Sequence, residues 1–209
     1  VASVTAGGKA ARTVWVREKS EAFEFPAETK PLLVRFDEGN ALIKEVSFPK
    51  DLDELLYQLR QDDVIGRMGA ATELLRFKND PRTFDALAAS AQSDPFWAVR
   101  RSTVDALGQL PDGRVRAALR TACLDRSSTV RTASLAALGN LKDPGLVEFF
   151  KERFAKDESE LARAEALRAL GKTGDASVIP FLEKSASVQS HRDMVGRAAT
   201  QALTQLRKQ

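Results

Sequence analysis

The chain has 209 residues, of which 43% are apolar and 29% charged, a composition typical of folded proteins that excludes a disordered or collagen-like chain. Its net charge of only +3 argues against nucleic acid as the partner, because phosphate binding needs a concentrated basic face. No apolar run approaches the roughly 20 residues that span a bilayer and no leader pattern opens the chain, so we predict a soluble protein with no membrane partner.

Residues 1–49 are predicted to form a small region of antiparallel strands, because branched and aromatic side chains alternate there with turn residues. Gly39 and Asn40 tolerate positive φ and predict a hairpin turn. So few short strands make a poor independent domain, so we expect another part of the protein to cover them. The expected strands are 13–16, 23–25, 32–36 and 42–48.

From Asp51 onward the apolar period becomes helical, and residues 50–209 are predicted to form an α-solenoid of about four and a half helix pairs. Asp51 with Glu54 three residues later is typical of a capping box. Several Asp-Pro pairs, among them Asp94-Pro95, are typical of helix starts with proline in the first turn. The expected helices are 51–61, 63–78, 81–92, 95–109, 113–124, 128–140, 144–156, 159–172, 176–187 and 191–207.

A repeat of 31 to 33 residues runs through this helical region. An arginine stands seven residues before a leucine four times, and a fixed period of this length with two helical stretches inside it indicates a solenoid. The four pairs are Arg67 and Leu74, Arg100 and Leu107, Arg131 and Leu138, and Arg163 and Leu170.

An aspartate precedes three of these arginines by six residues, and we expect these residues to form a structural ladder. An aspartate near a helix start accepts backbone amides, and an arginine about one and a half turns into the helix can donate its fork to the aspartate of an adjacent unit. In the last unit Gly196 takes the arginine position, which indicates a terminal cap. The ladder residues are Asp94, Arg100, Asp125, Arg131, Asp157 and Arg163.

Within each unit the apolar residues obey helical spacing. Val130, Ser134, Ala137, Leu138 and Leu141 are expected on one buried face. The small residues of this face are expected to let paired helices approach closely. These residues are Ala106, Ala137, Ala169 and Ala202.

The string Val-Arg-x5-Ala-Leu-Gly at 99–108 and 130–139, followed by Asp-Pro and a second helix, resembles the short bacterial form of the HEAT repeat. The resemblance covers about residues 62–209. It implies a right-handed stack of helix pairs whose second helices line a concave face, which binds proteins or braces larger enzymes and performs no catalysis itself.

A second resemblance covers about residues 13–60. The segments Phe23-Glu24-Phe25-Pro26 and Leu32 to Phe48, followed by Leu52 to Leu59, are similar to the end of the β-sandwich domain of aminopeptidase N-like zinc metallopeptidases, where it passes into the helical C-terminal domain. This resemblance implies a non-catalytic C-terminal region that braces or caps the catalytic domain of its parent chain and shapes substrate access. The peptidase domain would then precede Val1.

The zinc site of that family cannot be built from this chain. The site needs H-E-x-x-H with a further carboxylate, and the chain holds one histidine, His191. We therefore expect no catalytic, metal-binding or cofactor-binding residue here, and zinc only in a parent's catalytic domain. The alternative is a stand-alone HEAT scaffold for protein–protein interaction, and a further one is an accessory of a HEAT-like lyase or cofactor-attachment enzyme.

Two groups of residues are candidates for a contact surface. Phe96 and Trp97 are adjacent, so they cannot both face the same groove, and one of them is expected at the surface. Three arginines on one expected helix can form a solvated face or contact an acidic protein surface. These are Arg114, Arg116 and Arg120. We expect the lone cysteine, Cys123, to be a buried small hydrophobe.

Overall fold

The structure is a computed structural model that describes residues 1–5, 7–38, 41–43, 45 and 47–208. Spatial contacts divide the chain into two compact units, Val1–Ala70 and Ala71–Gln209. The predicted fold class is confirmed, since the chain is mainly helical and carries a small antiparallel sheet near its N-terminus. The predicted domain boundary at residues 49 and 50 follows the change of sequence period and stays a prediction.

The sheet of the first unit has the order β2-β1-β3, with both neighbouring pairs antiparallel. Two strands of the sheet, β1 and β2, precede all four predicted strands. Only β3 coincides with a predicted strand, the one at 32–36. The predicted strands at 13–16 and 23–25 were wrong, since no ladder forms there, and the described residues of 42–48 form none either. Gly39 and Asn40 of the predicted hairpin turn lie outside the described residues. The strands are β1 Ala2–Thr5, β2 Gly8–Ala11 and β3 Leu33–Arg35.

Hydrogen bonds from charged side chains link strand β3 to helix α1, Leu52–Gln61. Asp51 caps α1 by accepting a hydrogen bond from the backbone N–H of Glu54 at 2.9 Å, as predicted. The Glu54 carboxylate does not complete the capping box, because it accepts instead from the backbone N–H of Val34 in β3, also at 2.9 Å. One guanidinium nitrogen of Arg35 lies 2.5 Å from Asp62 Oδ1, just after α1.

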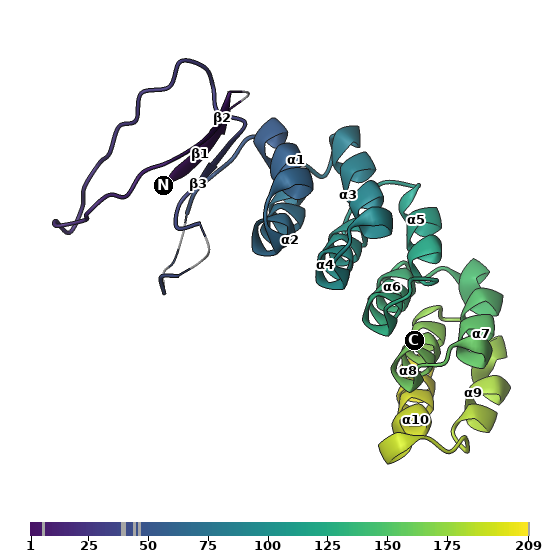
Figure 1. Cartoon of the computed structure of the whole chain (residues 1–209). Coiled ribbons are helices and arrows are strands. Elements are labelled where there is room, and N and C mark those ends of the chain that lie inside the picture. The colour runs from purple at the N-terminus through teal and green to yellow at the C-terminus, as the bar shows by residue number, and fades with distance from the viewer. Residues whose placement is uncertain (6, 39–40, 44, 46, 209) are drawn as a thin grey trace. The chain divides into compact units, whose positions relative to one another are not determined.

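The second unit is a stack of four helix pairs in two layers (Figure 1). Helices α3, α5, α7 and α9 form the first-helix layer, and helices α4, α6, α8 and α10 form the second-helix layer. Helix α2, Val64–Glu73, and the 3-10 turn Leu74–Phe77 precede the stack. The pairs are α3 Pro81–Ser93 with α4 Trp97–Leu107, α5 Val115–Ala122 with α6 Ser128–Asn140, α7 Val147–Lys156 with α8 Glu160–Lys172, and α9 Ile179–Ser185 with α10 Met194–Leu206.

The leucines of the repeat form the interior of this stack. Leu107, Leu138 and Leu170 are each fully buried, as the period requires. Leu141 departs from the predicted face, since it follows the end of α6 and is 38% exposed. Helical spacing no longer applies to a residue beyond the helix end.

The second helices approach one another closely through glycine and alanine. A methyl group built on Gly171 of α8 would lie 2.7 Å from Cα of Ala202 in α10, and one on Gly139 of α6 would lie 2.9 Å from Cβ of Ala169 in α8. Real Cβ atoms essentially never come so close. The alanines therefore permit close contact between successive units, whereas the sequence pattern predicted it within each pair.

Several helix starts differ in detail from the prediction. Helix α4 begins at Trp97, not Pro95, because the Asp94 carboxylate accepts from the backbone N–H of Phe96 at 2.9 Å and closes a turn before the helix. In the last pair a 3-10 turn over His191–Asp193 precedes α10. Two residues of that turn, Arg192 and Asp193, have positive φ, so the helix cannot run on through them.

Candidate protein-interaction surface

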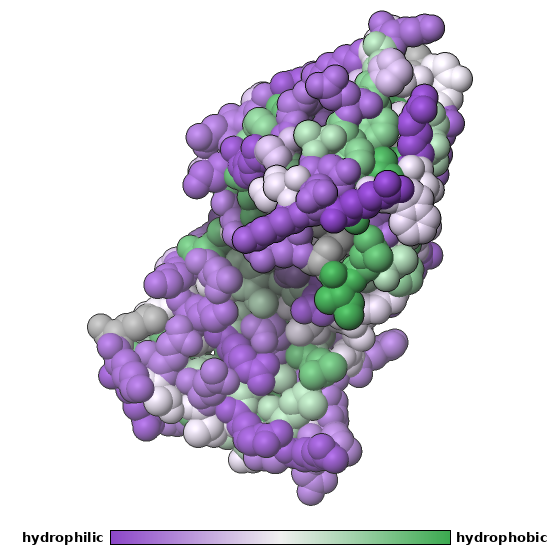
Figure 2. All heavy atoms as spheres, turned by 90° about the vertical axis from the view of Figure 1, so that its left-hand side faces the viewer, coloured by the Kyte–Doolittle hydropathy of each residue, from purple (hydrophilic) through white to green (hydrophobic). Residues whose placement is uncertain are grey.

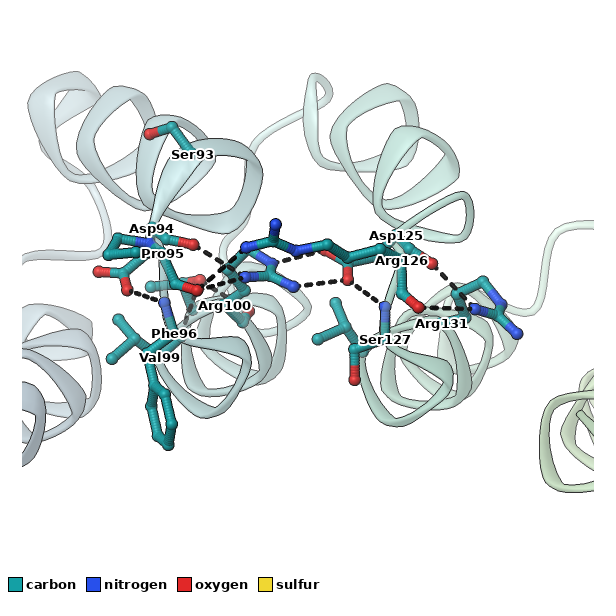
Figure 3. Close-up of polar contacts among 12 residues, drawn as sticks. Ser93, Asp94, Pro95, Phe96, Val99, Arg100, Asp125, Arg126, Ser127 and Arg131 are labelled. Atoms are coloured by element: carbon teal, nitrogen blue, oxygen red, sulfur yellow. Dashed lines mark hydrogen bonds and ion pairs between the residues drawn. The ribbon is translucent and has the colours of Figure 1, made fainter.

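Four of the six predicted ladder residues form forked ion pairs between successive repeats (Figure 3). Arg100 of α4 donates from Nε and Nη2 to the two carboxylate oxygens of Asp125, at 2.7 and 2.8 Å. Arg131 of α6 repeats this arrangement with Asp157, at 2.8 and 2.7 Å. Two parallel hydrogen bonds fix both distance and angle, so each pair sets the spacing of neighbouring repeats.

The ladder aspartates also cap the corners, the short turns that join the first helix of a pair to the second. Asp125 Oδ1 accepts from the backbone N–H of Ser127 at 2.7 Å, and Asp157 Oδ1 accepts from that of Ser159 at 2.9 Å. Burial alone raises the pKa of Asp125, but the hydrogen bonds from Arg100 and from Ser127 N–H outweigh it and hold this pKa below its usual range. The carboxylate is thereby kept charged.

The arginines of the ladder bind the corner backbone as well. Arg100 Nη1 donates to the carbonyl of Asp94 at 2.8 Å, and Arg131 Nη1 donates to that of Asp125 at 2.9 Å. Arg126 lies over the ladder and donates to the carbonyl of Pro95 at 3.1 Å (Figure 3). The corner carbonyls are therefore largely occupied, and the corners are held in one conformation.

The ladder ends at the last repeat. Arg163 donates from Nε to the carbonyl of Phe154 at 3.1 Å, and its guanidinium lies 5.0 Å from the centre of the Phe154 ring. Ser190, near the position that a further aspartate would take, instead accepts from the backbone N–H of Val195 at 2.9 Å. Of the three predicted ladder arginines, the structure pairs two, Arg100 and Arg131, with an aspartate of the next repeat.

The three arginines predicted as a possible contact face each have an intramolecular partner. Arg114 forms ion pairs with Asp85 at 2.8 Å and Asp112 at 2.7 Å. Arg116 forms one with Asp143 at 2.9 Å. The guanidinium of Arg120 lies 4.7 Å from the centre of the Phe149 ring. Two of the three arginines are thus paired with carboxylates of the same chain, and the third lies over an aromatic ring.

Both aromatic residues of the candidate surface are exposed, whereas only one of the two was predicted to be. Phe96 and Trp97 are 40% and 42% exposed, and their ring centres are 5.8 Å apart. The ring of Phe96 points away from the ladder guanidinium groups (Figure 3). Both side chains are therefore available to another molecule.

Sequence reasoning missed two further exposed apolar side chains near the corners. Leu124 lies in the corner between α5 and α6 and is 64% exposed, and Leu161 is the second residue of α8 and is 56% exposed. The sequence signal that could have predicted their exposure is their position. Leu124 stands beside a ladder aspartate and Leu161 near the start of a second helix, where polar residues are usual.

A groove of about 520 Å³ lies between the first two of these corners. The ends of α3 and α5 line it, together with Leu124 and Arg126. A separate groove of about 420 Å³ lies on the sheet of the first unit, where Phe23, Phe36 and Phe48 line it. On the face drawn in Figure 2, apolar side chains reach the surface in several patches among polar ones.

The lone cysteine offers no reactive thiol. Burial raises the pKa of the Cys123 thiol to about 12, so it stays protonated, and the residue is fully buried as predicted. Among the described residues, no three His, Cys, Asp or Glu side chains are grouped to hold a metal ion. No helix in the same part of the chain is both long and apolar enough to cross a membrane.

Comparison with known proteins identifies the repeat. A family model described as HEAT repeats matches residues 52–139, 84–160 and 147–209. The solved structure of the complex of CpcE and CpcF of phycocyanin lyase from Nostoc sp. PCC7120 is similar to this chain at 22% identity and a TM-score of 0.61, over 81% of this chain and 70% of that one. At that identity the likeness shows the fold alone. No curated protein sequence matches the chain.

Proposed function

The chain belongs to the HEAT-repeat family, and from that premise we propose that it is a non-catalytic scaffold that holds a partner protein against its second-helix layer. In HEAT arrays this layer lines the concave face. The similar structure is itself a complex of two proteins, which supports a protein as the partner.

One observation carries this proposal: the second helices form a continuous surface. Helix α4 packs on α6, α6 on α8 and α8 on α10, whereas among the described first helices of the unit only α3 and α5 meet closely. The glycine–alanine contacts and the forked ion pairs fix the spacing of this surface. A surface that is ordered before binding loses little conformational entropy on binding, which favours affinity.

Site-specific photo-crosslinking tests the proposal. A photoreactive amino acid replaces Thr132 or Ala136 on the outer face of α6, or Gln201 on that of α10, and the purified chain is incubated in extract of its native host. Matched control positions are Glu152 on α7 and Glu183 on α9, which are exposed in the first-helix layer.

We expect the second-layer positions to crosslink one protein that the control positions do not. The purified partner should then bind the purified chain with one-to-one stoichiometry in titration calorimetry. Equal crosslinking from both layers, or no complex between the purified proteins, would contradict the scaffold role.

A second candidate function is favoured by the groove on the sheet. Aromatic side chains line it, and Trp15 and Ile43 of the same region are largely exposed, as expected where a further domain covers the sheet. We therefore retain the brace of an aminopeptidase N-like peptidase as the alternative. Sequencing the gene upstream of Val1 tests it, because this role requires a preceding H-E-x-x-H segment.

A further inference from the structure

The sheet of the first unit has one open edge. The order β2-β1-β3 makes β2 and β3 the two edge strands. The outer edge of β3 faces α1, because the backbone N–H of Val34 donates there to the Glu54 carboxylate at 2.9 Å. All four residues of β2, Gly8–Ala11, are exposed. Strand β2 is therefore the edge at which a further strand can pair.

The register of the hairpin fixes which main-chain groups of β2 point outward. Val1 and Arg12 exchange two backbone hydrogen bonds, each at 2.7 Å. In an antiparallel ladder, pairs that exchange hydrogen bonds alternate with pairs that exchange none. Ala11 and Lys9 are therefore in pairs of the second kind, so that the N–H and C=O of both point away from β1. Among the described residues, no partner binds these outward groups.

The chemistry of these groups selects the kind of partner. Lys9 and Ala11 each present one donor and one acceptor, and they lie two residues apart, about 6.8 Å along the strand. A second extended strand presents donors and acceptors at that same spacing. The interior of an α-helix has none to offer, because its backbone groups bond to one another. The open edge of β2 thus fits strand addition by an extended segment.

A pocket beside this edge gives the added strand a place for one side chain. The pocket has a volume of about 280 Å³ and lies over one face of the sheet. Ala10 lines it from β2, whereas Phe25, Pro26 and Pro31 line it from the loop that follows the hairpin. Residues opposite each other in neighbouring strands point to the same face. The partner residue opposite Ala10 therefore lies on the side of the pocket, and a large apolar side chain suits it.

Charge adds a second feature to the partner segment. Arg12 also lines the pocket and is exposed, and its guanidinium forms no ion pair with the described residues. A carboxylate on the partner residue opposite Arg12 would complement it. In an antiparallel addition this acidic residue precedes the apolar residue opposite Ala10 by two positions.

The same charges disfavour a second copy of this chain as the occupant. Residues 8–12 carry two cations, Lys9 and Arg12, and no acidic residue. Two copies of β2 paired with each other would bring these cations together and leave Arg12 without a carboxylate. Like charges on neighbouring strands are destabilising, and a short edge strand with a lysine is a common guard against self-pairing. An acidic partner segment is therefore the better fit.

We propose that the open edge of β2 binds an extended segment of a partner protein by antiparallel strand addition. An acidic residue of the segment lies against Arg12, and a large apolar residue two positions later lies over Ala10 in the pocket. This surface belongs to the first unit, so the proposal goes beyond the scaffold function of the second-helix layer and does not depend on it.

The test uses the full chain and a synthetic eight-residue peptide of valine and threonine that carries a glutamate and, two positions later, a leucine. Titration calorimetry should show saturable binding. The peptide residue between the glutamate and the leucine lies opposite Ala11, so N-methylation of that residue removes an interstrand hydrogen bond and should weaken binding about tenfold. N-methylation of the leucine is the matched control. It should leave the affinity within about twofold, because the N–H of the leucine points away from β2.

Two variants of the chain test the same contacts from the other side. Ala11→Pro removes the outward N–H and leaves the bonds between β1 and β2 in place, so it should weaken binding about tenfold without changing thermal unfolding. Arg12→Glu should also weaken binding of the peptide. A peptide with lysine in place of the glutamate should restore the affinity for this variant.

Three results would overturn the proposal. They are no saturable binding, equal losses for the two N-methylated peptides, and a dimer of the chain in sedimentation that Ala11→Pro dissociates. The last result would mean that a second copy occupies the edge. Crosslinking from Thr132 or Ala136 reports on the second-helix layer alone, so failure here leaves the scaffold function standing.

Discussion

At the residue scale, the ladder arginines and aspartates combine two tasks that are usually separate. Asp125 caps a corner of its own repeat and accepts the arginine of the preceding one. Both charged side chains are nearly inaccessible, with 3% of Arg100 and 8% of Asp125 exposed. Loss of either partner leaves a buried charge without its counter-ion, which costs far more than loss of a surface ion pair.

The pH dependence of stability should report on these carboxylates. Burial raises the pKa of Asp157, but hydrogen bonds from Arg131 and from Ser159 N–H outweigh it, so the folded pKa lies below that of the unfolded chain. A lowered folded pKa contributes stability that is present above the unfolded pKa, near 3.9, and is lost as pH falls through the folded pKa. We expect the free energy of unfolding in urea to drop below about pH 4.

Asp157→Asn provides the comparison. At pH 7 this variant should lose about 3–5 kcal/mol, because Arg131 keeps its charge without a partner. Its stability should fall less than that of the unmodified chain between pH 5 and pH 2. Parallel pH profiles for the two proteins would show that Asp157 is not the titrating group.

Buried and exposed leucines of one repeat give a second prediction at this scale. Leu138→Ala should lower the free energy of unfolding by about 2–5 kcal/mol, because it opens a cavity at a fully buried site. Leu141→Ala, three residues later, is the control and should cost well under 1 kcal/mol because Leu141 is partly exposed. Equal losses in urea unfolding would refute the assigned register.

At the element scale, the second-helix layer depends on glycine and alanine at the contacts between successive helices. Gly171 and Ala202 bring α8 and α10 together so closely that one methyl group would have to displace the backbone of the neighbouring helix. Backbone atoms cannot rotate away as a flexible side chain does. These contacts therefore determine the angle between successive repeats.

Gly171→Ala should destabilise the chain by about 1–3 kcal/mol through overpacking, despite the higher helix propensity of alanine. Gly113→Ala is the control, since nothing lies within 4 Å of the methyl group that it would add. Thermal unfolding measures both. Equal losses for the two variants would mean that the destabilisation does not arise from the contact with Ala202.

The sequence predicts the helices well and the strands poorly, for a physical reason. Each helix pair repeats its apolar spacing, its aspartate cap and its buried leucine, so independent signals agree over residues 51–207. The stretches 13–16 and 23–25 have strand-forming side chains, but pairing depends on distant residues, and β1 instead pairs with Gly8–Ala11 and Leu33–Arg35. The exposed Leu124 and Leu161 were missed because apolar residues at helix spacing are expected in the core.

At the scale of the whole molecule, the chain before α1 buries much less apolar surface than the helical array does. In the described part of residues 1–50 only Leu33 is a buried large hydrophobic residue, whereas every helix pair of the second unit contributes several. The stretch from Arg12 to Leu32 has no helix or strand. Segments with few buried contacts open at low free energy.

Limited trypsin digestion should therefore cut first within residues 12–32, at Arg17 or Lys19. We expect a resistant helical fragment by mass spectrometry, with helical circular dichroism and a melting temperature close to that of the intact chain. The array itself holds many arginines that trypsin could reach, and they serve as the internal control. Early cleavage within 97–172 would show that the repeats open more readily than this stretch.

Both forked ion pairs run in the same direction, from the arginine of one repeat to the aspartate of the following repeat. Excision of residues 125–156 would place Asp157 directly after Leu124, where Arg100 would find the carboxylate that Arg131 now holds. We therefore expect the array to tolerate removal of whole repeats, because no buried charge is left without its ion-pair partner. Gain or loss of whole repeats would then change the length of the array, and so the length of partner that it can contact, without leaving a buried charge unpaired.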